Sequence, residues 1–158
     1  MKDSLRTGIS FGLTSAVITT LGLMVGLHSG THSRIVVLAG ILTIAIADAF
    51  SDALGIHVSE EAENKHTIKQ IWAATISTFL AKFLFAMIFV VPVILFPLYI
   101  AIVISLIWGL SILSLLSYLI AKSQSEPAWK IVGEHLMIAI VVIGITNWVG
   151  DWIGKLNA

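Results

Sequence analysis

The chain has 158 residues, of which 58% are hydrophobic and 11% are charged, whereas an ordinary soluble domain has about 25% charged residues. The 9 basic and 9 acidic residues give a formal net charge of zero, so we expect no nucleic-acid partner. Cysteine is absent, which excludes disulfides, thiolate metal sites and cysteine catalysis. This composition predicts an integral membrane protein whose main partner is the lipid bilayer.

Five apolar runs are each long enough to cross a hydrocarbon core of about 30 Å, which takes about 20 residues. We expect a single all-α transmembrane domain over residues 1–158, with helices at about 8–28, 34–63, 67–96, 98–121 and 128–154. The connections between these helices are short, so they leave no room for a folded module outside the bilayer.

The first predicted helix carries small residues on one side. They recur at spacings of three and four and are Gly8, Gly12, Ser15, Thr19, Gly22 and Gly26. Because lipid supplies no hydrophobic drive for helix pairing, such a stripe marks a place where another backbone approaches closely. Packing within the chain and a homodimer through this helix both fit the pattern.

The second predicted helix carries acids where lipid should still surround it. At 100° per residue, with Asp48 as the origin, Asp52 falls at about 40° and Glu63 at about 60°, on one narrow face. Ionisable groups inside a spanning helix are expensive and usually face a protein interior or a water path, so they are functional candidates. Glu60 and Glu63 either collect cations for this face or form a solvated helix end.

Lys82 is the unusual residue of the third predicted helix, because it lies far from both ends of an apolar run. If the third helix enters the hydrocarbon near Ala74, Lys82 lies roughly 12 Å deep at 1.5 Å per residue, and Asp48 and Asp52 lie at similar depths. We therefore expect an ion pair within the membrane. The pair either neutralises charge structurally or is exchanged when a cation displaces the ammonium.

The rest of the chain is expected to be scaffold. Pro92 and Pro97 predict a kink near the end of the third helix and a tight hairpin into the fourth. In the fifth helix, Asn147 and Asp151 share a face. We expect Trp148 to anchor this helix at the membrane interface.

Lysines and arginines in the connections predict the orientation. Six lie on the side of the N-terminus, namely Lys2, Arg6, Lys65, Lys69, Lys122 and Lys130, and two lie on the other side, namely Arg34 and Lys155. Because cytoplasmic loops carry the excess of positive charge, we expect a cytoplasmic N-terminus and an external C-terminus.

The first two predicted helices contain FGLTSAVITTLGLMVGL at residues 11–27 and ADAFSDALGIHVS at residues 47–59. These two stretches resemble the vacuolar iron transporter family of iron and manganese exporters. The family's first helix reads roughly L-G-x-N-D-G-L-V-T-T and then L-x-x-G-V, and the first stretch keeps Gly12, Thr19, Thr20, Leu23 and Gly26. The family's second helix reads approximately A-G-x-x-S-M-A-x-G-E-x-x-S. Here ADAFSDALGIHVS keeps Ala47, Ser51, Ala53, Gly55 and Ser59. The resemblance implies five spanning helices, a homodimer, a prokaryotic cell membrane as the location, and transport of Fe²⁺ or Mn²⁺.

The departures from the family concern the acids. The family's aspartate in the first helix corresponds to Ser15, and its glutamate in the second corresponds to Ile56. Asp48 stands where the family usually has a small residue. Asp52 stands where it has methionine, which replaces a soft thioether by a hard oxygen. The cytoplasmic domain that many members insert between the second and third helices is reduced here to about a dozen residues.

These observations favour a transporter that exports a divalent cation, Fe²⁺ or Mn²⁺, from the cytoplasm by proton antiport. The expected ligands are Asp48, Asp52, Ser15 and Ser51, with Glu60 and Glu63 where the cation enters and Lys82 as the ion-pair partner. The metal is the transported substrate, and we expect no permanently bound cofactor. The alternative is a membrane scaffold or assembly partner with structural ion pairs. We expect no enzyme, because neither H-E-x-x-H nor G-x-S-x-G occurs.

Overall fold

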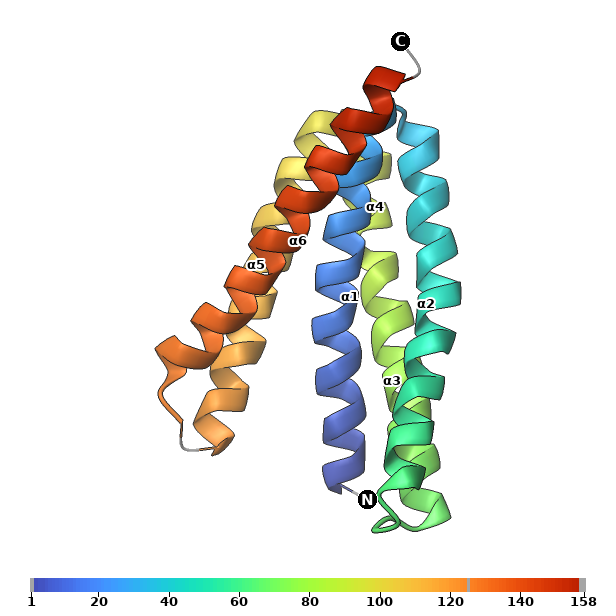
Figure 1. Cartoon of the computed structure of the whole chain (residues 1–158), viewed down its shortest axis with the longest axis vertical. Coiled ribbons are helices and arrows are strands. Elements are labelled where there is room, and N and C mark those ends of the chain that lie inside the picture. Colours follow the sequence, from blue (N-terminus) through green and yellow to red (C-terminus); the bar gives the residue numbers. More distant parts are fainter. Residues whose placement is uncertain (1, 125, 157–158) are drawn as a thin grey trace.

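The computed structural model describes residues 2–124 and 126–156 of the chain. The helices are α1 (Lys2–Thr31), α2 (Arg34–Ala62), α3 (Ile68–Ile88), α4 (Val90–Leu95), α5 (Leu98–Gln124) and α6 (Ala128–Leu156). The described residues contain no strand. Figure 1 shows a bundle with the two termini at opposite ends. The all-α prediction is confirmed.

Among the described residues, five segments are long and apolar enough to cross a membrane when α3 and α4 are counted together, and they are 27 to 30 residues long. Large apolar side chains cover their outer surfaces; Phe50 and Leu54, for example, are 62% and 63% exposed. An apolar exterior of this extent is the expected surface of helices surrounded by lipid. The structure therefore agrees with the five apolar helices expected of a multi-pass membrane protein.

The predicted kink near Pro92 is present as a break between α3 and α4 at Phe89. Pro92 has no N–H to donate to the carbonyl of Ile88, four residues earlier, and its ring crowds that carbonyl. The helix is therefore interrupted one turn before the proline.

Arg34, at the start of α2, binds carbonyl groups at the end of α4. Its Nε donates to the carbonyl of Val93 at 2.6 Å, and its Nη2 donates to the carbonyls of Ile94 and Phe96 at 2.7 Å each. The last carbonyls of a helix have no partner within the helix, and a guanidinium can bind several of them at once. Arg34 therefore acts as a structural cap across the bundle.

α1 lies at the centre of the bundle, and its glycines contact two different helices. A Cβ added to Gly8 would overlap the backbone of Ala74 in α3, and one added to Gly26 would lie 3.1 Å from the carbonyl oxygen of Thr146 in α6. The small-residue stripe of α1 is therefore covered within the chain. Packing inside one copy explains the stripe, and the homodimer stays a prediction.

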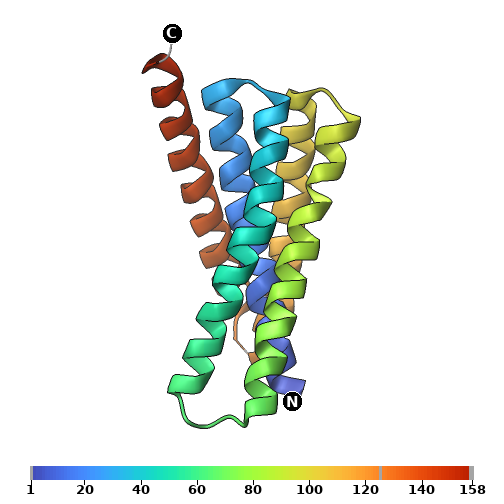
Figure 2. The same cartoon turned by 90° about the vertical axis from the view of Figure 1, so that its right-hand side faces the viewer.

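The hairpin of α5 and α6 is tilted relative to α1. Figure 1 shows α6 close to α1 near the C-terminal end of α1 and diverging from it toward the α5–α6 connection. Figure 2 shows α2 and α3 on the opposite side, next to each other and joined by a short turn. The bundle consequently packs α1 closely against α3 along the N-terminal half of α1 and leaves space there on the side of α5 and α6.

Candidate functional site

α2 presents Asp48 and Asp52 one turn apart at its middle. Asp48 is the central residue of Arg34–Ala62, so it lies about 21 Å from either end of the helix at 1.5 Å per residue. The buried stripe of α2 contains Ala45, Ala49 and Ala53. These small side chains let α2 approach its neighbours, which places both carboxylates beside α3.

Lys82 of α3 lies between the two aspartates and is only 1% exposed. Its Nζ is 2.5 Å from Oδ2 of Asp48 and also forms a salt bridge with Oδ2 of Asp52. The same ammonium donates a hydrogen bond to Oγ of Ser15 in α1 at 2.8 Å. The ion pair expected from the depths of these residues is therefore present. We call these four residues, from three helices, the Lys82 cluster.

Ser15 reaches Lys82 because α1 and α3 approach each other at Gly12. A Cβ added to Gly12 would lie 2.6 Å from the carbonyl oxygen of Thr78 and 3.2 Å from the backbone nitrogen of Lys82. Only a glycine leaves space for the backbone of α3 at this distance. One turn later, the side chain of Ser15 points to the same helix and meets the ammonium.

The Lys82 cluster contains two carboxylates and one ammonium, so it has one negative charge in excess when all three groups are ionised. The other lysines and arginines of the chain lie near helix ends or in connections, so none of them compensates this charge at mid-helix. An unpaired charge in a low-dielectric interior is costly. The cluster is therefore suited to take up positive charge, either a proton or another cation.

Asp48 is the more accessible end of the Lys82 cluster, and Lys82 is the less accessible one. The side chain of Asp48 is 26% exposed, whereas that of Lys82 is 2% exposed. Asp48 and Ser51 line a groove of about 660 Å³ whose walls come from α1, at Leu23 and Leu27, and from residues 36–51 of α2. The cluster is therefore closed around the ammonium and open at Asp48.

The remaining predicted ligands lie apart from the cluster. Ser51 lies in the groove beside Asp48 and is exposed. Glu60 lies two turns beyond Asp52, about 12 Å along the helix. The carboxylates of Glu60 and Glu63 are instead 3.5 Å and 3.6 Å from Nε2 of His66. Glu60 and Glu63 lie too far along α2 from the two aspartates, so the structure does not bring them to Lys82.

In residues 2–124 and 126–156, no group of three or more histidine, aspartate or glutamate side chains is arranged to hold a metal ion. A cation at the Lys82 cluster would have the carboxylates of Asp48 and Asp52 and the hydroxyl of Ser15 as side-chain ligands, with water or backbone oxygens completing its shell. Hard oxygen donors of this kind suit Mg²⁺, Ca²⁺ and Mn²⁺.

Other polar contacts tie helices together away from the cluster. Ser29 of α1 lies 2.8 Å from Oδ1 of Asn147 and 2.5 Å from Oδ1 of Asp151 in α6. The shared face of Asn147 and Asp151 was visible in the sequence, but their partner on α1 was not. His57 lies 2.9 Å from Oγ1 of Thr75, so it belongs to the α2–α3 contact.

Comparisons of the chain with protein-family models, with curated proteins and with solved structures found no match. The function is therefore inferred from the sequence and from the arrangement of the described residues.

Proposed function

We propose that this chain is a membrane transporter that carries a cation across the bilayer at the Lys82 cluster, in exchange for protons. The observation that supports this proposal most directly is the pair of carboxylates around one buried ammonium at the middle of a spanning helix. Ionisable groups at this depth typically mark ion pathways and proton relays. The groove beside Asp48 is the proposed route of the cation to the carboxylates, although apolar side chains form most of its lining.

We propose a divalent metal, Fe²⁺ or Mn²⁺, as the cation, exported from the cytoplasm. The likeness of residues 11–27 and 47–59 to the vacuolar iron transporter family supports this choice, although the acids occupy other positions. The oxygen ligands of the cluster favour the harder Mn²⁺. The excess of lysine and arginine on the N-terminal side supports a cytoplasmic N-terminus.

The charges of the cluster suggest how metal and proton are exchanged. A divalent cation held by the carboxylates of Asp48 and Asp52 would displace the ammonium of Lys82 from between them. Protons that bind the same carboxylates would remove their negative charge and release the metal. Metal and proton would therefore compete for Asp48 and Asp52.

The alternative function is a membrane scaffold in which the cluster is structural. One observation favours it: Lys82 is almost fully buried and has oxygen partners on two other helices. A buried ion pair that is well satisfied can serve only to hold the helices in register. Under this alternative the ammonium never leaves the carboxylates.

Thermal unfolding in detergent with and without Mn²⁺ separates the two functions, using the parent, Lys82→Met and the matched control Lys69→Met on the exposed part of α3. For a transporter, Mn²⁺ raises the Tm of the parent and of Lys69→Met. It raises the Tm of Lys82→Met further, because the competing ammonium is gone. For a scaffold, Lys82→Met lowers the Tm and Mn²⁺ changes none of the three proteins.

A further inference from the structure

A second polar site lies between α1 and the α5–α6 hairpin, at the end of the bundle where the hairpin diverges from α1. A cleft of about 510 Å³ is lined there by Arg6, Ser10 and Thr14 of α1 and by Ser123, Gln124 and His135 of the hairpin. The three α1 residues are four apart, so they lie along one side of the helix. The cleft follows α1 for about 12 Å from Arg6 to Thr14.

The lining of this cleft is rich in hydrogen-bond donors and contains no carboxylate. The hydroxyls of Ser10 and Thr14 form no hydrogen bond with the described residues, whereas Thr19 of the same helix donates to the carbonyl of Ser15 at 2.9 Å. Polar groups at membrane depth need a partner. These hydroxyls are therefore available to water or to a polar ligand in the cleft.

His135 lines the cleft from α6. Its Nδ1 lies 2.7 Å from Oγ of Ser117, and the Ser117 hydroxyl also lies 2.6 Å from the carbonyl oxygen of Leu113. The contact with Ser117 occupies Nδ1, whereas Nε2 forms no hydrogen bond with the described residues and is available to a ligand.

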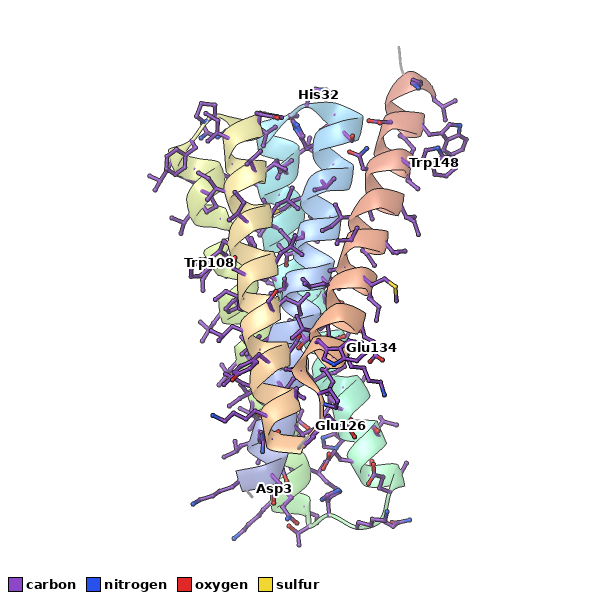
Figure 3. The ribbon with its side chains drawn as sticks, turned by 90° about the vertical axis from the view of Figure 1, so that its left-hand side faces the viewer. Asp3, His32, Trp108, Glu126, Glu134 and Trp148 are labelled. Carbon is purple, nitrogen blue, oxygen red and sulfur yellow. The ribbon has the colours of Figure 1, made fainter. Side chains whose placement is uncertain are left out.

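The acids at this end of the molecule do not enter the cleft. Figure 3 shows Asp3 and Glu126 toward the same end and Glu134 nearer the middle of the bundle, and none of them lines the cleft. Among the described residues that line the cleft, Arg6 alone has a permanent charge. A guanidinium accompanied by hydroxyl and amide donors is the pattern that binds phosphate and other oxyanions. The cleft is therefore unsuited to the cation proposed for the Lys82 cluster.

We propose that this cleft binds the phosphate group of an anionic phospholipid from the leaflet on the N-terminal side. Arg6 lies about 6 Å from the start of α1, at the level expected for headgroups. Phe11 and Ile120 supply apolar walls in the same cleft, which suit an acyl chain. A free phosphate ion shares the headgroup chemistry but would leave these walls uncovered.

Native mass spectrometry of the full chain in detergent tests the proposal with three probes: phosphatidylglycerol, diacylglycerol, which lacks the phosphate, and inorganic phosphate. The parent should bind phosphatidylglycerol in preference to diacylglycerol. Arg6→Gln should weaken phosphatidylglycerol binding about tenfold, because it removes a charged donor. Lys2→Gln, with the same charge change on the same helix outside the cleft, should bind as the parent does.

Millimolar inorganic phosphate that displaces the lipid would support the anion site and identify the free ion as its occupant. Equal binding of diacylglycerol and phosphatidylglycerol would overturn the proposal. So would parent-like affinity in both Arg6→Gln and the double variant Ser10→Ala/Thr14→Val. Asp52→Asn changes the Lys82 cluster and not the cleft, so it should bind phosphatidylglycerol as the parent does. Loss of cation transport and loss of lipid binding can therefore be told apart.

Discussion

Ser15 and Lys82 are 67 positions apart in the sequence, and their side chains meet in the middle of the bundle with Oγ 2.8 Å from Nζ. This contact joins the central helix α1 to the charged pair formed by α2 and α3. Any displacement of α1 along α3 would therefore change the surroundings of the ammonium. The packing of α1 and the charge of the cluster should be coupled.

The closest test of this coupling is Gly12→Ala. The added Cβ would lie 2.6 Å from the carbonyl oxygen of Thr78, so α1 must shift away from α3. We expect a loss of about 1–3 kcal/mol in unfolding free energy, the usual cost of overpacking. Gly55→Ala is the matched control, because its Cβ meets nothing within 4 Å. Thermal unfolding should show Gly12→Ala destabilised and Gly55→Ala unchanged or more stable.

The excess negative charge of the cluster predicts a non-additive result for its two acids. Asp48→Asn or Asp52→Asn alone leaves one carboxylate for Lys82, so each single variant should be about as stable as the parent. The double variant leaves the buried ammonium unpaired and should lose about 3–5 kcal/mol. Denaturant unfolding measures all four proteins, and equal, additive losses would contradict the shared ion pair.

The cap that Arg34 forms on α4 predicts a different effect for methionine and lysine. Arg34→Met removes all the side-chain donors to the carbonyls of Val93, Ile94 and Phe96, and should cost about 1–3 kcal/mol. Arg34→Lys keeps the charge but not the planar fork, so it should recover only part of the loss. Full recovery in a thermal unfolding assay would show that charge alone matters.

The polar contact between α1 and α6 should make a smaller contribution. Ser29→Ala removes the hydroxyl that contacts Asn147 and Asp151, and we expect a loss of about 1 kcal/mol. The control is Ser111→Ala on the exposed side of α5, which should leave the unfolding temperature unchanged. Equal effects of the two substitutions would argue against a contact that stabilises the helix pair.

The sequence predicted those features that depend on one helix at a time. Apolar runs indicated the five long helices, and Pro92 indicated the break before α4. Asp48 and Asp52 shared a helical face, and their depth matched that of Lys82, which indicated the ion pair. Each inference used only the rise and rotation of a helix.

The sequence could not predict which helices are neighbours at each level along the bundle axis. The small-residue stripe of α1 showed that another backbone comes close, but not that α3 covers one half and α6 the other. Glu63 shared an angle with Asp48 on the helical wheel, but the wheel ignores distance along the axis. The partners of Arg34 and Ser29 depend on the tilt of whole helices, which no local pattern records.

The most direct test of the central proposal is Mn²⁺ uptake into proteoliposomes with an acidic interior, measured for the parent, Asp52→Asn and Glu63→Gln. Glu63→Gln is the matched control, because it removes an acid of α2 that lies outside the Lys82 cluster. The account predicts uptake by the parent and by Glu63→Gln that collapses when the pH gradient is removed, and no uptake by Asp52→Asn. Uptake by Asp52→Asn at the parent rate, or none by the parent, would contradict it.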